Sequence, residues 1–303
     1  MKEILILISF IGMFGCGLSS QNQVNPGFFA EGFEIPYTLN APTQKMKLDR
    51  ELVEISGLTY SQKTKSLLAV NDEDAFVFVL DPYSGKILDK YDFGKADDYE
   101  GIASHDNYIY ITESNGNIKV VNESTGEKTT EYDDLLSRDN DVEGLCFNPV
   151  NKKLLMAAKG DSEADGNDKD VKAVFSMEIA TGKIDEKPYL YQNLSKAMKT
   201  LQPKYISSNA IVNLSVSSRV DKYGPSAIAV QPGTDLIYML SSSGKLLTVS
   251  DQYGDIKAIV FLKNAVHIQP EGITFAPDGT LFISNEGRSG KGVIYRYEPI
   301  EKE

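Results

Sequence analysis

The 303-residue sequence contains no tryptophan, only two cysteines and only two histidines. This scarcity argues against a structural zinc site, which takes about four cysteine or histidine ligands close together. It also leaves little material for a nucleophile activated by histidine. A Walker phosphate loop and a dinucleotide-binding glycine fingerprint are absent as well. The sequence therefore predicts no nucleotide-dependent enzyme and no hydrolase of the serine or cysteine type.

Runs of basic residues are also absent, and 43 acidic residues against 31 basic ones give a formal net charge of -12. Such a surface repels nucleic acids, because their affinity for proteins depends mainly on phosphate contacts with lysine and arginine. We therefore expect no nucleic-acid partner. The acidic excess has two explanations that stay open here. It keeps the protein soluble, or some of the carboxylates cluster to hold a cation.

A long apolar run occurs only at the start of the chain, at residues 4–14. It is too short to cross a bilayer as a permanent helix, which needs about 20 residues, and its length and position are typical of a secretory signal. Gly15 and Cys16 follow it. This arrangement resembles the bacterial lipoprotein signal, in which the cysteine after a small residue is lipidated and begins the mature chain.

The beginning of the chain therefore predicts an export signal. We expect a signal peptide at residues 1–15, a lipidated Cys16 with a flexible tether over residues 16–31, and one folded domain at residues 32–303. The protein would be exported and anchored by its lipid to a membrane of the cell envelope. An ordinary cleaved signal with an incidental cysteine is the alternative.

An apolar, strand-like pattern that contains one small residue recurs five times along the folded domain. The small residue is Gly57, Gly101, Gly144, Ala227 and Gly272 in turn. Most copies start about 44 residues apart and contain several short strands, which is the signature of a β-propeller blade. The sequence therefore predicts an all-β protein, a single β-propeller of about five four-stranded blades.

One step in this series is doubled, between Gly144 and Ala227, so a sixth blade is the alternative. Residues 194–201 have apolar side chains at helical spacing, which favours five blades with a helical insertion near residues 191–222. The last copy has only three strands before the chain ends. An N-terminal segment, either residues 33–39 or residues 45–52, is expected to supply the fourth and so leave no open sheet edge.

Several motifs extend beyond a generic propeller repeat. They are Glu-Ile-Ser-Gly-Leu at residues 54–58, Asp72 with Glu73, Gln-Pro-Glu-Gly-Ile at 269–273, Ala-Pro-Asp-Gly-Thr-Leu at 276–281 and Ser-Asn-Glu-Gly at 284–287. In these motifs the chain, over about residues 45–298, resembles the SdiA-regulated family of bacterial β-propeller proteins. The resemblance implies a propeller similar to metal-binding, esterase-like and phytase-like propellers. It predicts the fold more firmly than an activity, because a fold alone does not define a function.

The first strand of each propeller blade lines the central channel. The residues that directly precede the five small positions are Ser56, Glu100, Glu143, Ser226 and Glu271. Three carboxylates in a narrow space repel one another unless they are protonated or bridged by a cation. An oxygen-only ligand set suits Ca²⁺ or Mg²⁺, so the pattern predicts a calcium site formed by the three glutamates. Alternatively, each polar residue holds backbone amides at the start of its strand.

Residues near the ends of the second strands and beside the first strands are further candidates for the same channel mouth. These candidates are Asn71, Asp72, Glu113, Lys159, Ser241, His267, Asn285 and Glu286. Lys159 has a special place among them, because it could replace a metal ion by pairing with Glu143 or Glu100.

Two functions stay open at this level. The preferred one is a binding or scaffold lipoprotein of the cell envelope, with a small molecule or a protein as its ligand, because the sequence has an anchor signal and lacks a catalytic constellation. The alternative is a metal-dependent hydrolase of phosphate or carboxylic esters. In that enzyme the glutamates would hold a cation that activates water, and Lys159 or Arg288 would contact the anionic group of the substrate.

Overall fold

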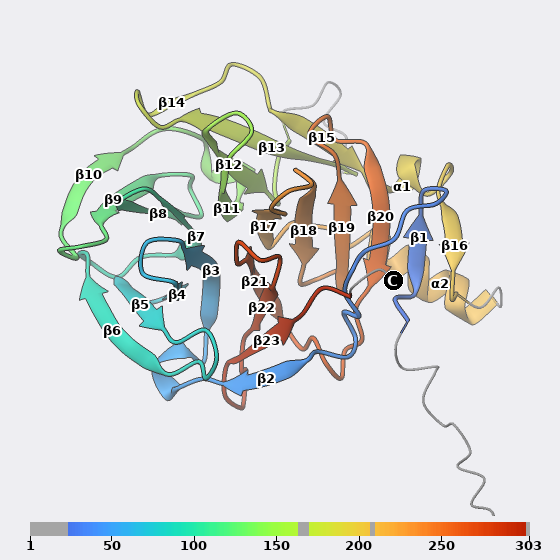
Figure 1. The fold of residues 1–303 in the computed structure, drawn as a ribbon. Helices are drawn as coiled ribbons and strands as arrows, with labels where there is room; N and C mark the ends of the chain where they lie inside the picture. The colour runs from blue at the N-terminus through green and yellow to red at the C-terminus, as the bar shows by residue number, and fades with distance from the viewer. Residues whose placement is uncertain (1–23, 163–169, 207–209, 301–303) are drawn as a thin grey trace, which may run out of the picture.

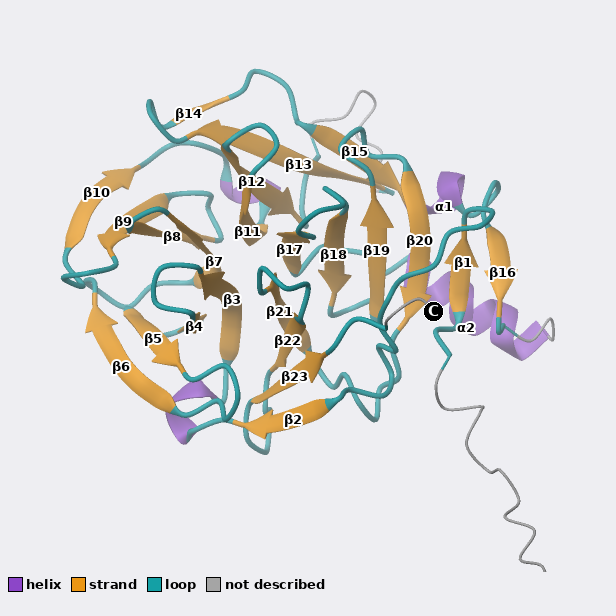
Figure 2. Ribbon diagram, in the orientation of Figure 1, coloured by secondary structure: helices purple, strands orange, loops and turns teal. Residues whose placement is uncertain are grey.

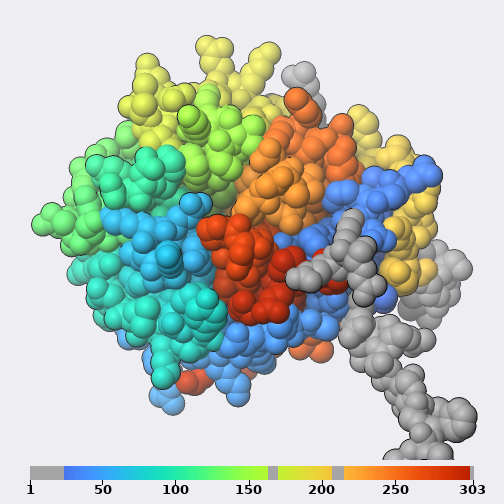
Figure 3. All heavy atoms as spheres, viewed as in Figure 1, coloured from blue at the N-terminus to red at the C-terminus, as the bar shows by residue number. Residues whose placement is uncertain are grey.

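The computed structural model describes residues 24–162, 170–206 and 210–300, so the predicted signal peptide and Cys16 lie outside the described part. Within that part, no helix is long and apolar enough to cross a membrane. Five antiparallel sheets stand around a central axis (Figure 1), and the space-filling view shows the blades abutting side by side around the ring (Figure 3). The prediction of an all-β, five-bladed propeller is confirmed.

The blades follow one another along the chain, each running from the channel outwards. The first consists of β3 (Ile55–Ser61), β4 (Ser66–Asn71), β5 (Phe76–Leu80) and β6 (Ile87–Asp92). The second consists of β7 (Tyr99–His105), β8 (Tyr108–Glu113), β9 (Ile118–Asn122) and β10 (Lys128–Tyr132). The third consists of β11 (Val142–Asn148), β12 (Lys153–Ala158), β13 (Val171–Glu178), β14 (Lys183–Ile184) and β15 (Leu190–Asn193), the last two both paired with β13.

The remaining two blades include N-terminal strands. The fourth consists of β17 (Ala227–Val230), β18 (Ile237–Ser241), β19 (Leu246–Ser250) and β20 (Ile256–Phe261), extended by β1 (Gly27–Phe29) and β16 (Gln202–Lys204). The fifth consists of β21 (Pro270–Phe275), β22 (Leu281–Asn285), β23 (Val293–Tyr297) and β2 (Gln44–Lys47). The short 3-10 helices η1 (Arg50–Leu52) and η2 (Arg138–Asn140) precede the first and third blades.

The doubled step of the repeat contains an insertion and no additional blade. Between β15 and β17 the chain forms α1 (Leu194–Ala197), β16 and α2 (Ala210–Val220). The strand β16 pairs with β1, which in turn pairs with β20, so the insertion widens the fourth blade. The two helices lie at the outer edge of the ring beside β16 and β20 (Figure 2).

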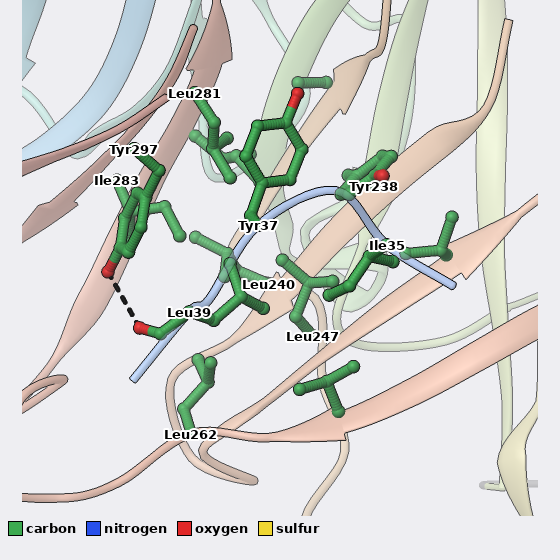
Figure 4. Close-up of a cluster of buried hydrophobic side chains, with 14 of the residues drawn as sticks. Ile35, Tyr37, Leu39, Tyr238, Leu240, Leu247, Leu262, Leu281, Ile283 and Tyr297 are labelled. Atoms are coloured by element: carbon green, nitrogen blue, oxygen red, sulfur yellow. Dashed lines mark hydrogen bonds between the residues drawn. The ribbon is translucent and has the colours of Figure 1, made fainter. Parts of the chain in front are cut away.

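The ring is closed by the second of the two N-terminal segments considered. The strand β2 pairs with β23, with Met46 opposite Ile294, and so completes the fifth blade. The first segment, residues 33–39, instead packs into the core between the fourth and fifth blades. There the Tyr37 hydroxyl donates to the Gly279 carbonyl at 2.6 Å. The Tyr297 hydroxyl donates to the Leu39 carbonyl at 2.9 Å (Figure 4).

The recurring small residues lie where the innermost strands of neighbouring blades approach one another. A Cβ atom added to Gly101 would lie 2.8 Å from the Leu145 backbone nitrogen, and one added to Gly272 would lie 2.6 Å from the Leu58 Cβ. Real Cβ atoms do not approach so closely, so the repeat keeps these positions small because the blades meet there. The residue that precedes each of them borders the channel, and this arrangement positions the candidate site.

Candidate functional site

The three predicted glutamates come together on the channel axis. Glu100, Glu143 and Glu271 line one pocket of about 10 Å³, together with the innermost strands of all five blades; we call it the channel pocket. At each glutamate the pairing with the second strand of the blade shifts by one residue. Such a bulge leaves one residue out of the regular pairing and redirects its side chain. The bulge therefore explains locally how each carboxyl group reaches the channel.

Lys159 supplies a positive charge to this group. Of the two partners considered for it, the structure has Glu143: the Lys159 ammonium pairs with the Glu143 carboxylate, and Asp141 lies 3.6 Å away. Lys159 directly follows β12. A Cβ atom on Gly224 would lie 2.8 Å from the Lys159 Cγ, so this glycine leaves room for the stem of the lysine. The pair favours the ionised form of Glu143.

The other two glutamates have strongly raised pKa values. Burial and the nearby charge of Glu143 raise the pKa of Glu100 to about 9 and the pKa of Glu271 to about 8. Burial also raises the pKa of Glu143, and the Lys159 ammonium opposes that rise. Near neutral pH, Glu100 and Glu271 are therefore protonated. Repulsion within the channel pocket is relieved by these two protons and by one lysine.

A calcium ion at Glu100, Glu143 and Glu271 stays a prediction. Among the residues that the structure describes, no group of three or more histidine, cysteine, aspartate or glutamate side chains is arranged to hold a metal ion.

A larger cavity of about 310 Å³ opens beside the channel pocket and shares Glu143 and Glu271 with it. We call it the mouth cavity. Its lining consists of Glu143, Lys159, Gly224, Ser226, Ser242, Ser243, Lys245, Gln269, Glu271 and Arg288. This volume lies at the lower end of the range for small-molecule sites, roughly 300 to 1,000 Å³.

Two cations of the mouth cavity form no ion pair in the described part of the chain, although the charges of Glu271 and Glu286 act on Lys245 and that of Glu286 on Arg288. Lys245 donates to the Ile268 carbonyl, and the Arg288 Nε donates to the Gln269 side chain at 2.6 Å, but neither forms a salt bridge there. Burial, followed by the charge of Arg288, lowers the pKa of Lys245. Two cations that repel each other beside serine hydroxyls form an environment suited to an anion.

The two serines of the predicted ring serve the structure. The Ser56 hydroxyl lies 2.9 Å from the Glu100 carbonyl oxygen, and the Ser226 hydroxyl donates to the Pro270 carbonyl at 2.8 Å. Each bond therefore links the innermost strand of one blade to that of the next. These contacts differ from the alternative considered for the ring, because the serines donate to carbonyl groups of the next blade and do not hold amides of their own strands, and Ser56 also donates to the Glu100 carboxyl group at 3.1 Å.

Four other predicted mouth residues have structural contacts and do not line the mouth cavity. Asn71 bonds to the Glu51 carbonyl and to Asp74, and Ser241 accepts from the amides of Gly224 and Gly244. Glu113 pairs with Lys119 inside the second blade. His267 is fully buried against the Leu39 carbonyl and Tyr297. Their place in the sequence repeat did not reveal these partners.

The last three predicted residues gather near Glu54, between the first and fifth blades. Burial and the charge of Glu54 raise the pKa of Asp72 to about 6, and burial and the charge of Asp72 raise the pKa of Glu286 to about 7. One oxygen of Asp72 and the side-chain amide of Asn285 are buried without a hydrogen-bond partner in the described part. The region around Glu54, Asp72 and Glu286 is therefore acidic as well.

Sequence analysis missed Ser242 and Lys245 as members of the site. Both lie in the turn between β18 and β19, the second and third strands of the fourth blade. Lys159 lies in the corresponding connection of the third blade, between β12 and β13. This correspondence is the signal that would have found Lys245. The sequence did not reveal this correspondence, because β12 and β18 share no motif other than apolar residues.

Replacing Lys159 with methionine keeps the packing against Gly224 and removes the charge beside Glu143. We expect the free energy of unfolding at pH 8 to fall by about 2 kcal/mol, less than for a fully buried pair because the lysine is partly exposed. The loss should be smaller at pH 4, because burial raises the pKa of Glu143 above its ordinary value and its protonation removes the charge that Lys159 balances. Denaturant titrations at both pH values measure this effect, with exposed Lys196→Met as the control. Equal stability of Lys159→Met and the control at pH 8 would contradict the role of the pair.

The comparisons with known proteins agree with the geometry. Among solved structures, glutaminyl cyclase from Myxococcus xanthus is similar, with 13% identity, a TM-score of 0.56, and coverage of 85% of this chain and 95% of that one. Virginiamycin B lyase from Staphylococcus aureus has 18% identity, a TM-score of 0.43, and coverage of 84% and 73%. At these identities the likeness concerns the fold alone.

No curated protein sequence matches the chain. A family model described as SdiA-regulated matches residues 38–288, which include the innermost strands of all five blades and every residue of the mouth cavity. The chain therefore belongs to the SdiA-regulated family of β-propeller proteins.

Proposed function

We propose that this protein is an exported binding protein of the cell envelope, anchored through a lipid on Cys16, whose propeller binds a small ligand with an anionic group in the mouth cavity. The observation that carries the proposal is that two cations, Lys245 and Arg288, line this cavity and repel each other, while neither forms an ion pair among the described residues. An anion between them would relieve their repulsion and form charge-assisted hydrogen bonds.

The chemistry of the cavity favours a carboxylate or a phosphate as that anion. The guanidinium of Arg288 presents a planar fork that matches either group, whereas Lys245 acts as a point charge. The hydroxyls of Ser242 and Ser243 add neutral hydrogen-bonding groups. Because the cavity measures about 310 Å³, it suits a small molecule better than a protein loop.

The proposed location follows from the start of the chain. Acyl chains on Cys16 would attach the protein to a membrane, since each buried methylene contributes about 0.8 kcal/mol. Because Gly27–Phe29 form β1 and pair with β20, the tether predicted over residues 16–31 would be shorter and end before Gly27. The ester-hydrolase alternative stays a prediction, because no contact among the described residues specifically favours it.

The melting temperature of the full chain, purified in detergent, tests the binding proposal. Sodium acetate, butanoate and phosphate are added at constant ionic strength, with chloride as the reference. A ligand that binds only the folded state must raise the melting temperature. We expect butanoate or phosphate to do so in the parent and not in Lys245→Met/Arg288→Met. Equal responses of the two proteins, or none in either, would contradict the proposal.

The same assay addresses calcium. After treatment with EDTA, calcium is added to the parent and to Glu100→Gln/Glu271→Gln. A rise in melting temperature in the parent alone would support the predicted calcium site. Equal curves with and without calcium in the parent would oppose it, and they would leave the anion proposal unaffected.

A further inference from the structure

The mouth cavity is lined by side chains of both charges. Glu143 and Glu271 also border the channel pocket, where Glu100 joins them, and we call this part of the lining the floor. Lys245 and Arg288 line the mouth cavity but not the channel pocket, and we call them the rim cations. A ligand that fills the cavity therefore meets both cations and carboxyl groups.

The floor has fewer cations than carboxyl groups. Three glutamates share one lysine, and Lys159 pairs with Glu143. Glu100 and Glu271 avoid repulsion by keeping their protons, which is why burial and Glu143 raise both of their pKa values. A cation that arrives at the floor would take over the role of one of these protons.

Glu271 is the better placed of the two to exchange its proton. It lines both the mouth cavity and the channel pocket, whereas Glu100 lines only the channel pocket. Hydrogen bonds from Ser242 and Gln269 favour the ionised form of Glu271. At Glu100 the two hydrogen bonds act in opposite directions, because the bond from Ser56 favours the ionised form and the bond with Asp98 favours the protonated form. Glu271 is therefore the carboxyl group that both faces the mouth cavity and has neighbours suited to its negative charge.

An organic ammonium suits this floor better than a metal ion does. Lys159, which pairs with Glu143, would oppose a divalent cation at these carboxyl groups more strongly than the single charge of an ammonium group. An ammonium group has three N–H donors that bond to separate oxygens. The rim cations would also repel a free metal ion, whereas an anionic group on the same molecule would bind to them.

We propose that the mouth cavity binds a small zwitterion, with its ammonium group at Glu143 and Glu271 and its carboxylate at Lys245 and Arg288, and that binding releases the proton of Glu271 to solvent. This inference rests on the proposed function and names its ligand class. The protons balance: the ammonium binds intact, the carboxyl O–H bond of Glu271 breaks, and one proton leaves. The two ionised glutamates then face two cations, Lys159 and the ligand.

The test uses the full chain in detergent and ligands that differ only in their charged ends. The zwitterions are glycine, 3-aminopropanoate, 4-aminobutanoate and 5-aminopentanoate, while butanoate and butylamine each carry one charge. Affinity is measured by calorimetry, and proton release is measured with an indicator dye in unbuffered sodium chloride at pH 7. We expect one zwitterion to bind at least about tenfold more tightly than either single-charge probe and to release close to one proton.

Two variants assign the ends of the ligand. Glu271→Gln should abolish proton release and reduce the affinity for the zwitterion to that for butanoate, with exposed Glu127→Gln as the matched control. Lys245→Met should weaken butanoate and the zwitterions but leave butylamine unchanged. These opposite patterns would not arise from a general loss of folding.

The outcomes distinguish this inference from the proposed function on which it rests. If butanoate binds the parent as tightly as every zwitterion and no proton is released, the zwitterion inference is wrong and the anion site stands. If butylamine alone matches the zwitterions, both the rim assignment and the inference are wrong. If none of the probes binds the parent, the inference and the proposed function both fail.

Discussion

Gly272→Val is expected to lower the free energy of unfolding by about 3 kcal/mol or more, because it forces a branched side chain between two blades. A Cβ atom at this position would lie 2.3 Å from the Ser284 hydroxyl oxygen, 2.6 Å from the Leu58 Cβ and 2.9 Å from the Ser56 carbonyl oxygen. Two of these atoms belong to the neighbouring first blade. The strands would have to separate, and the ring offers no free direction for that movement.

Denaturant unfolding measures this effect, and Gly290→Val is the control. Gly290 lies in an exposed turn, where the nearest atom to an added Cβ, the Gly287 carbonyl oxygen, is 3.3 Å away. Gly272→Ala should fall between the parent and Gly272→Val. If valine at 272 costs no more than valine at 290, then close blade contact does not explain the repeating small residue.

The second large effect is a loss of stability as the pH rises. Glu100 and Glu271 have folded-state pKa values of about 9 and about 8, against 4.5 for an ordinary glutamate. Between these values the folded protein binds more protons than the unfolded chain does, so the free energy of unfolding falls with increasing pH. The contribution is complete below about pH 4.5 and is lost as the pH rises through 8 and 9.

We expect the free energy of unfolding to decrease by roughly 2 to 3 kcal/mol per pH unit between pH 6 and pH 8, because each of the two protons contributes about 1.4 kcal/mol per unit. Asp72 and Glu286, whose pKa values are also raised, add a change in the same direction at lower pH. Buried His267, whose pKa is lowered to about 4, acts oppositely, since it destabilises the fold in acid. One histidine does not offset four carboxyl groups, so urea titrations should show stability falling from about pH 5 upwards.

Glu100→Gln/Glu271→Gln should flatten this profile, because glutamine keeps the shape of the protonated acid and cannot ionise. The double variant should therefore be more stable than the parent at pH 9, while Glu127→Gln follows the parent throughout. If the free energy of unfolding of the parent does not change from pH 6 to pH 9, Glu100 and Glu271 are not protonated in the folded protein as proposed. A double variant whose stability still falls as steeply as that of the parent would also contradict their protonation.

Much of the fold could be predicted from the sequence, because the blade repeat reflects a local physical constraint. A small residue recurs wherever two innermost strands meet, and the polar residue before it reaches the channel. The closure of the ring was harder to predict. Residues 33–39 and 45–52 are both apolar enough to be the missing strand, and only the pairing of Met46 with Ile294 distinguishes them.

The site could be predicted only in part, since neighbours from different blades determine its chemistry. The three glutamates share a repeat position, so their meeting in the channel pocket follows from the pattern. Their protonation depends on burial and on Lys159, which the pattern shows only as a nearby residue. Lys245 carries no motif of its own, and Glu113 looked equivalent to Lys159 until its bond to Lys119 became visible.

The most direct test of the account is the carboxyl titration of Glu100, Glu143 and Glu271 by ¹³C nuclear magnetic resonance in metal-free protein, with signals assigned by single glutamine substitutions. We expect Glu100 and Glu271 to titrate near pH 9 and pH 8, because protons and Lys159 together neutralise the channel pocket. If Glu100 and Glu271 both titrate near the ordinary value of 4.5, the floor is ionised at neutral pH. That result would contradict the account and would call for a permanently bound cation instead.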